Sequence, residues 1–184
     1  MEKFYTIMPS PVGFLKLVAT DKGLEAVLWE DDDPGRVRLG AMTKSAEHPV
    51  LKQAVQEMRE YFAGKRKSFD VDVDFVGTDF QKAVWRALLS IPFGETRSYA
   101  QVARAVGKPN AVRAVGGAIG RNPLSVVAPC HRVIGSDGSL TGFAGGMATK
   151  QYLLTHEQLR GDLGGADRSR RENNAAAPAP QVAE

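Results

Sequence analysis

The pattern of hydrophobic and polar positions predicts short strands in the first third of the chain. Runs of β-branched and aromatic residues, bounded by Pro and Gly, lie at Phe4–Met8, Phe14–Ala19 and Leu24–Trp29. Asp21-Lys22-Gly23, between the last two runs, is typical of a hairpin turn. These features together favour a small sheet near the start of the chain.

A helix and one more strand are predicted to complete this first domain. Apolar residues recur at helical spacing from Pro49 to Phe62, and Gly64 ends that helix. Phe69–Phe75 alternates between apolar residues and aspartates, which predicts a strand with one solvent-exposed face. We interpret the aspartates as solvent-facing carboxylates rather than metal ligands. The expected result is an α+β domain over residues 1–77.

The pattern changes near Thr78, where a mainly helical domain is predicted over residues 78–160. Thr78 can cap a first helix, and Ser98 can cap a second over Tyr99–Val106. A Gly-rich stretch at 135–146 precedes a last helix, Met147–Leu159. Residues 161–184 are rich in Arg, Asp, Asn, Ala and Pro without any period, so this tail is predicted to be disordered.

Two of these helices resemble a helix-turn-helix. Gly107-Lys108-Pro109 turns the chain after Tyr99–Val106, and Asn110 can cap the next helix, Ala111–Ile119. That helix has a face with almost no bulk, made of Arg113, Ala114, Gly116, Gly117 and Ala118. A Gly inside a helix costs roughly 1 kcal/mol relative to Ala. Close approach of another surface is therefore expected there, from either a neighbouring helix or a nucleic-acid backbone.

Charge is distributed unevenly along the chain. Residues 1–79 hold 11 Lys and Arg against 14 Asp and Glu, whereas residues 80–160 hold 10 against 3. A basic second half suggests contact with a polyanion, although a basic surface kept only for solubility fits this pattern equally well.

Composition excludes several classes of protein. No apolar run approaches the ~18–20 residues that a membrane-spanning helix needs, and the first residues lack the pattern of a secretory signal. One cysteine cannot form an internal disulfide or a Cys-rich zinc site, and three scattered histidines do not suggest a metal. We expect a cytoplasmic protein with no metal, no cofactor and no membrane partner.

Cys130 is the candidate for chemistry. A thiol reacts as a thiolate, and Cys130 is followed by His131 and Arg132. On an extended strand adjacent side chains point to opposite faces, so a bridging water is the expected relay between thiol and imidazole. Glu157 is the best-placed carboxylate to orient His131. A buried structural cysteine and a cysteine hydrolase both remain open on these residues alone.

The sequence around Cys130 resembles the active site of the O6-methylguanine-DNA methyltransferases. Pro129-Cys130-His131-Arg132-Val133 matches their motif. Four further blocks occur in family order and spacing: residues 94–99 (GETRSY), 113–118 (RAVGGA), 121–123 (RNP) and 141–146 (TGFAGG). The resemblance covers roughly residues 78–159, and the first domain is similar to the family's ribonuclease-H-like domain in size and element order.

The resemblance implies DNA repair by stoichiometric, irreversible transfer of the alkyl group from O6-alkylguanine, and also O4-alkylthymine, to Cys130. It implies that His131 acts as a water-mediated base held by Glu157, that Asn122 orients the active-site turn, and that Tyr99 donates to the leaving guanine. The implied partner is double-stranded DNA, bound through its minor groove, and the alkyl group is transferred after the nucleotide has been flipped out. A monomer is implied, with cooperative binding on DNA as a further expectation.

The resemblance also implies a set of DNA-binding residues. Arg113 enters the base stack, Ala114 and Gly116 line the groove, and Ile119 packs on the flipped base. The carbonyls of Cys130 and Val133 read the guanine amino group, and the backbone near Ala144 and Gly145 meets the guanine oxygen. Phe143 stands where many members have Tyr, and Ala144 stands where some have Ser. Both residues, Phe and Ala, resemble those of the bacterial-type enzymes.

Three other functions compete with this interpretation. An alkyltransferase-like binding module would lack the reactive cysteine, which is present here as Cys130. A helix-turn-helix transcription factor would need base-reading side chains, but residues 111–119 offer essentially one, Arg113. A thiol hydrolase would have no use for a basic helix-turn-helix. The chain also lacks the cysteine cluster of the two-cysteine adaptive-response regulators.

Overall fold

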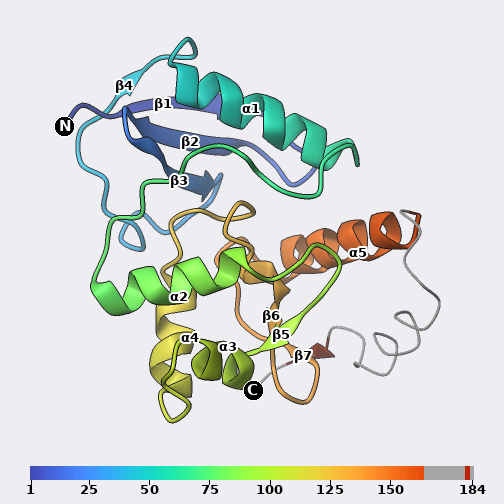
Figure 1. Ribbon diagram of the computed structural model, residues 1–184. Helices are drawn as coiled ribbons and strands as arrows, with labels where there is room; N and C mark the ends of the chain where they lie inside the picture. Colours follow the sequence, from blue (N-terminus) through green and yellow to red (C-terminus); the bar gives the residue numbers. More distant parts are fainter. Residues whose placement is uncertain (164–180, 183–184) are drawn as a thin grey trace.

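The computed structural model describes residues 1–163 and 181–182, and it shows a sheet-and-helix part stacked on a mainly helical part (Figure 1). This arrangement confirms the predicted α+β class. The division at residues 77 and 78 stays a prediction. Of the tail expected at 161–184, residues 164–180 and 183–184 lie outside the described residues, residues 161–163 continue the last helix, and Gln181–Val182 form strand β8.

The first part is built on a four-stranded sheet in the order β3-β2-β1-β4. Its strands are β1 (Phe4–Met8), β2 (Leu15–Thr20), β3 (Gly23–Trp29) and β4 (Thr43–Lys44). β2 pairs antiparallel with β1 and β3, and β4 runs parallel to β1. The predicted hairpin between β2 and β3 is confirmed, and Gly23 is needed there because any Cβ would lie 2.6 Å from the carbonyl oxygen of Asp72.

The strand predicted at Phe69–Phe75 is not regular. Only Val73 bridges to Leu24 of β3, through hydrogen bonds from Leu24 N to Asp72 O (2.7 Å) and from Asp74 N to Leu24 O (2.8 Å). The carboxylate of Glu57 accepts the backbone N–H groups at residues 70 and 71, which removes them from any ladder. The alternation itself is correct, since Val71 and Phe75 are buried and Asp70 and Asp72 are exposed.

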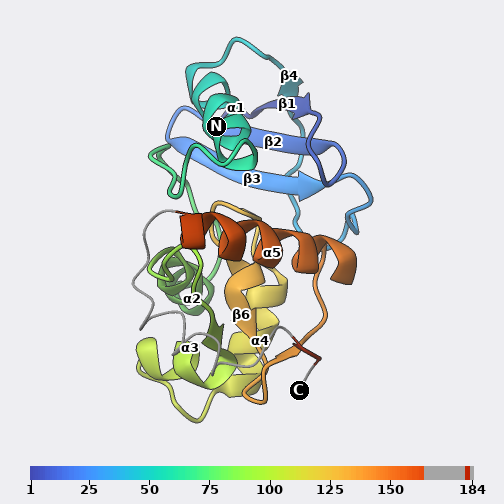
Figure 2. The ribbon, with the colours of Figure 1, turned by 90° about the vertical axis from the view of Figure 1, so that its right-hand side faces the viewer.

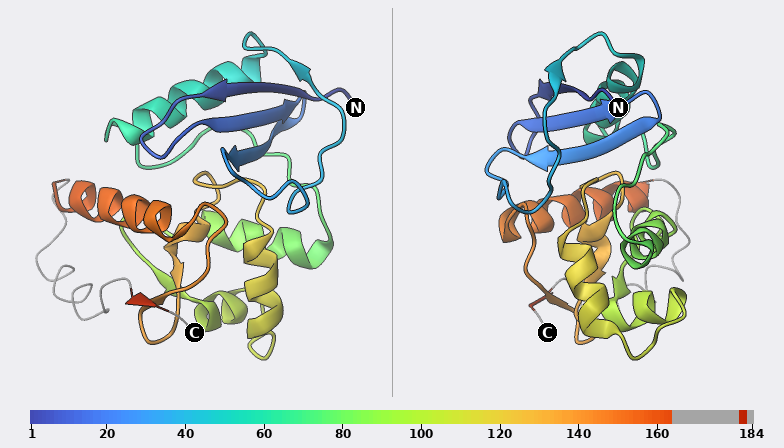
Figure 3. Two further views of the ribbon diagram at one scale, coloured as in Figure 1. Left: turned by 180° about the vertical axis from the view of Figure 1, so that it is seen from behind. Right: turned by 90° about the vertical axis from the view of Figure 1, so that its left-hand side faces the viewer.

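Helix α1 (Pro49–Phe62) has the predicted bounds and packs against the sheet (Figure 3). Its buried residues include Leu51, Met58 and Tyr61. Tyr61 lies in the last turn of α1, and its hydroxyl reaches the second part of the molecule, where it contacts Glu157.

The second part begins with helices whose starts are set by capping boxes. Thr78 caps α2 (Asp79–Leu89) and Ser98 caps α3 (Tyr99–Ala105), each with a Gln three residues on that returns a hydrogen bond to the cap. Asn110 does not cap the next helix, α4 (Val112–Gly120). The reason is the tight turn after α3, in which Ala111 N donates to Lys108 O and Ala111 becomes the cap.

The remaining elements surround Cys130. They are β5 (Arg97–Ser98), the 3-10 turn η1 (Cys130–Arg132), β6 (Val133–Ile134), β7 (Ser139–Leu140) and α5 (Met147–Leu163). β5 and β6 pair in parallel, which joins the start of α3 to the segment after Cys130. α5 lies between the sheet and helices α2, α3 and α4 (Figure 2).

The two parts share one hydrophobic core. Its buried residues come from β2, β3 and α1 on one side and from α2, α3 and α4 on the other. The edge of β3 also bonds directly to the second part, since Val27 N donates to Pro123 O at 2.8 Å. The sheet therefore supports the segment that leads to Cys130. No helix among residues 1–163 is long and apolar enough to cross a bilayer.

Candidate active site

Two very tight turns lead to Cys130 and set its position. Val127 N donates to Ser125 O and Cys130 N donates to Ala128 O, each spanning only two residues. Val126 sits in the first turn with φ +71°, a conformation that a β-branched residue rarely adopts. The extended strand expected at Cys130 is wrong: Cys130–Arg132 form a 3-10 turn.

Asn122 holds these turns together. Its side-chain oxygen accepts from Leu124 N at 3.0 Å, and its amide nitrogen donates to Ala128 O at 2.8 Å. Asn122 is fully buried, so no solvent competes for these bonds. The two contacts fix the distance between the start of the loop and the residues just before Cys130.

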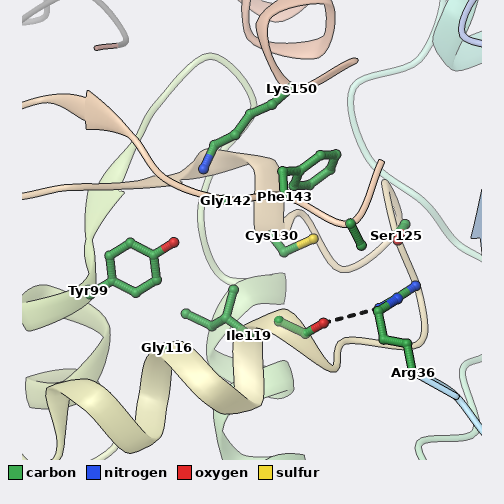
Figure 4. Close-up of a pocket in the computed structure, with 11 residues that line it drawn as sticks. Arg36, Tyr99, Gly116, Ile119, Ser125, Cys130, Gly142, Phe143 and Lys150 are labelled. Carbon is green, nitrogen blue, oxygen red and sulfur yellow. Dashed lines mark hydrogen bonds between the residues drawn. The ribbon is translucent and has the colours of Figure 1, made fainter. Parts of the chain in front are cut away.

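Cys130 lines a small cavity of about 40 Å³ (Figure 4). Five of the other predicted residues line it: Tyr99, Gly116, Ile119, Phe143 and Ala144. Arg36, Ser125 and Lys150 also line it and were not predicted. Tyr99 and Lys150 project into the same space from α3 and α5 (Figure 4).

His131 and Glu157 form a buried pair behind Cys130. His131 Nε2 lies 2.5 Å from Glu157 Oε2, with relative exposures of 0% and 1%. Burial opposes ionisation of Glu157, but His131 and Arg132 outweigh it and hold the pKa of this carboxyl well below its usual range. An ionised Glu157 only accepts, so the imidazole proton sits on Nε2. Nδ1 then carries the lone pair, and it has no hydrogen-bond partner among the described residues.

Two further residues hold Glu157, and neither was predicted. Arg132 donates through Nε to Oε1 (2.6 Å) and through Nη2 to Oε2 (3.1 Å), while its Nη1 donates to Ile91 O. Tyr61 donates its hydroxyl to Oε2 at 2.6 Å. Arg132 stands within the cysteine motif, so its position was a usable signal, whereas nothing in the helical pattern around Tyr61 indicated this contact.

The thiol and the imidazole are both shifted toward their neutral forms. Burial raises the pKa of the Cys130 thiol, against the smaller effects of Asn122, Lys150 and Arg36. Burial also lowers the pKa of His131, against the effect of Glu157. A protonated thiol needs to lose its proton before it can act as a nucleophile, so a base is required, and His131 directly follows Cys130 in the chain.

Lys150 places a second basic group at the cavity. Its Nζ donates to Val133 O at 2.7 Å and to Thr141 Oγ1 at 3.3 Å. Burial lowers the pKa of Lys150 to about 8, so it is largely charged at neutral pH. Lys150 lies two helical turns before Glu157 on the same helix, and this spacing was the signal available in the sequence.

Arg36 comes from the first part of the molecule. Its Nη1 donates to the carbonyls of Gly120 (3.3 Å; Figure 4) and Asn122 (2.7 Å). Asp32 holds the other side of the guanidinium through two bonds of 2.7 Å. Arg36 thus caps the last carbonyls of α4, and only the folded chain brings these residues together.

Tyr99 and the glycine-rich loop meet across the cavity. The Tyr99 hydroxyl is hydrogen-bonded to Thr141 Oγ1, and its ring faces Gly116 of α4. Phe143 packs edge-on against Trp29 of β3, with ring centroids 5.5 Å apart. A Cβ at position 145 would come within 2.7 Å of the same Trp29 ring, which explains Gly145.

The outer face of α4 lies away from this cavity. Arg113, Ala114 and Gly117 are exposed on it and do not line the cavity, whereas Gly120, the last residue of the helix, is exposed and lines the cavity. A Cβ added at Gly117 or Gly120 would meet nothing within 4 Å among the described residues. No neighbouring helix therefore requires Gly at these positions. Val133 is buried, and its carbonyl already accepts from Lys150.

Two family models match the chain. Residues 79–159 match the DNA binding domain of 6-O-methylguanine DNA methyltransferase, and residues 3–75 match the ribonuclease-like domain of the same family. The two matches together span most of the described residues.

Curated relatives and solved structures agree with this match. The methylated-DNA–protein-cysteine methyltransferase of Methanosarcina barkeri is 45% identical over 84% of this chain and 97% of its own length. The Mycolicibacterium paratuberculosis enzyme of the same name is also 45% identical, over 84% and 92%. A crystal structure of Mycobacterium tuberculosis OGT in complex with DNA has a TM-score of 0.77 and 43% identity, covering 85% of this chain and 94% of that one.

Proposed function

The chain belongs to the 6-O-methylguanine DNA methyltransferases, and from that premise we propose that Cys130 accepts the alkyl group of a guanine flipped out of the duplex. The family repairs DNA by direct alkyl transfer to a protein cysteine, and this chain is such an enzyme with DNA as its partner. The observation that carries the proposal is the sulfur of Cys130 in the cavity wall, backed by the His131–Glu157 pair.

Minor-groove binding by the outer face of α4 is supported by its unused space. Gly117 lies inside a helix, where Gly costs about 1 kcal/mol relative to Ala, and no described residue needs the gap. A wall of the DNA minor groove, packed against this face of α4, would fill the space beside Gly117. Arg113 is exposed on the same face and enters the stack where the nucleotide leaves, which offsets part of the unstacking cost.

The cavity must open to receive the base. A water needs roughly 10–15 Å³ of such volume, so about 40 Å³ suits a few waters and not a purine. The glycine-rich loop 141–146 is the wall that moves, because it is held by side-chain contacts rather than by a sheet. Ile119 then packs against the base, and the backbone near Ala144 and Gly145 faces the guanine oxygen.

The chemistry follows from the protonation states. The thiol proton passes through one water to Nδ1 of His131, and Glu157 stabilises the imidazolium. The thiolate attacks the alkyl carbon, the S–C bond forms as the C–O bond breaks, and the electron pair stays on guanine. Tyr99 donates a hydrogen bond to the guanine ring as negative charge develops there. The thioether has no leaving group and no second thiol to resolve it, so each molecule acts once.

Intact-mass measurement tests this function. A duplex oligonucleotide with one O6-methylguanine, mixed with excess protein, is expected to add one methyl mass per lesion, on the peptide that contains Cys130. Cys130→Ala is expected to bind the same DNA and gain no mass. Restored guanine with an unmodified Cys130 would overturn the proposal, and binding without transfer by the natural chain would favour a binding module. An O4-methylthymine duplex tests the second substrate in the same way.

A further inference from the structure

We infer that Tyr61 of α1 is a positioning residue for alkyl transfer, acting through Glu157 to set how strongly His131 accepts the thiol proton. This inference rests on the proposed function and deepens it. It assigns a part in the reaction to the first domain, from the far side of the His131–Glu157 pair.

The hydroxyl of Tyr61 and the imidazole of His131 share one carboxylate oxygen. Tyr61 donates to Glu157 Oε2 at 2.6 Å, and His131 Nε2 lies 2.5 Å from the same atom. All three side chains are at most 1% exposed. Arg132 Nε donates to the other oxygen, Oε1, so the Glu157 carboxylate cannot rotate without breaking two buried hydrogen bonds. Tyr61 therefore helps to fix the atom that orients His131.

Contacts that do not involve its hydroxyl hold Tyr61 in place. His156 Nε2 donates to the backbone carbonyl of Tyr61 at 2.9 Å, and His156 directly precedes Glu157 on α5. The Tyr61 ring packs against Phe69 and Phe93, at centroid distances of 5.6 and 6.2 Å. Removal of the hydroxyl should leave the ring where it is, and this makes a clean experiment possible.

The hydroxyl competes with His131 for electron density on Oε2. Each donor to a carboxylate oxygen weakens that oxygen as an acceptor for the others. Without Tyr61 the oxygen becomes a stronger acceptor for the His131 N–H, which favours the imidazolium. Burial, and next Glu157, raise the pKa of Tyr61 well above its usual value, so the hydroxyl stays protonated wherever the enzyme is assayed.

Other titratable groups act on the pair from two elements. Arg132 lies on the same turn as His131, and Lys150, Tyr152 and His156 face the three side chains from α5. Cys130 directly precedes His131. Lys150 has its pKa at about 8 and titrates on the opposite limb from His131, so the two groups can be separated in a pH profile.

The test is the pH dependence of transfer in Tyr61→Phe, measured at saturating methylated DNA with the full chain. We expect the acid limb to move to higher pH by roughly 0.5–1 pH unit, the scale on which one charge-assisted hydrogen bond shifts a pKa. Transfer on that limb then slows by about 3- to 10-fold, and the Kd for DNA stays unchanged. Tyr5→Phe, which removes a hydroxyl from β1 of the same domain, is the matched control and should leave the profile unchanged.

Two results would overturn the inference. One is an unchanged acid limb in Tyr61→Phe, including the case in which transfer slows equally at every pH. The other is a Tyr61→Phe shift of the same size in the Glu157→Gln background, since the effect should vanish without that carboxylate. His156→Ala, which frees the Tyr61 carbonyl, is the second variant and should give a smaller shift in the same direction. Failure of the proposed function looks different, because the natural chain would then not alkylate Cys130 at all.

Discussion

The outer face of α4 and the buried cluster of Tyr61, His131, Arg132 and Glu157 differ in how completely the chain itself fills and bonds them. On the outer face of α4, Gly117 leaves open space that no described residue fills. In the cluster, Glu157 accepts four hydrogen bonds from three residues within a space that excludes solvent. The face of α4 has space for a partner, whereas the hydrogen bonds to Glu157 are all supplied by the chain itself.

The DNA-binding surface and the reactive site therefore each lower the stability of the fold, but by different means. Exposed Gly in a helix gives up backbone stability so that a large surface can approach. Buried ions give up hydration so that a carboxylate and an imidazole hold one geometry. Variants that remove a partner of a buried ion should therefore weaken folding and chemistry together, whereas variants on the outer face of α4 should weaken DNA binding or repair of duplex DNA without weakening the fold.

The largest effect is expected from Arg132→Ala. It leaves Glu157 ionised and buried without its permanently charged partner, and breaking such a pair costs roughly 3–5 kcal/mol. Urea denaturation should show this loss of unfolding free energy, and transfer to Cys130 should fall with it. Arg121→Ala, on the exposed residue after α4, should change stability by less than about 0.5 kcal/mol. Equal stability of the two variants would refute the role given to the cluster.

A smaller and more selective effect is expected from Arg113→Ala. Loss of the residue that enters the stack should slow transfer from duplex DNA by about 10- to 100-fold, since unstacking costs a few kcal/mol. Transfer from free O6-methylguanine, which needs no unstacking, should change little. Rate measurements on both substrates decide the matter, with Arg59→Ala on α1 as the control. An equal loss on both substrates would contradict the role in the stack.

The smallest effect is expected from Gly117→Ala, and its two parts have opposite signs. The fold should gain up to about 1 kcal/mol, because Ala favours the helix and the new Cβ meets nothing. DNA affinity should fall by a few-fold, because the methyl group occupies space meant for the groove. Thermal unfolding and a DNA titration measure the two parts. Tighter or unchanged DNA binding would show that this face of α4 is not the groove-facing one.

Elements governed by local chemistry could be predicted from the sequence. The starts of α2 and α3 follow from Thr78 and Ser98, because each capping box lies within four residues. α1 was predicted with its bounds because its apolar spacing is regular. The motif around Cys130 was equally local: His131 is adjacent to the cysteine, Glu157 is the only acid predicted in the last helix, and the resemblance then gave both a role.

Features that depend on distant contacts could not be predicted. Tyr61 and Glu157 are separated by 96 positions, and Arg36 and Asn122 by 86. The 3-10 turn at Cys130 depends on tight turns that Asn122 stabilises from eight residues away, so a strand was expected instead. The regular strand expected at Phe69–Phe75 failed for the same reason, because Glu57 binds two of its N–H groups.

Burial of Cys130 has a further consequence for a protein that can be used only once. The residue is 7% exposed and burial raises the pKa of its thiol, so very little thiolate is present before DNA arrives. Oxidants and free alkylating agents react with thiolates and reach exposed ones first. Between encounters with damage, the acceptor is thereby spared from soluble electrophiles, and each molecule is preserved for the lesion that it removes.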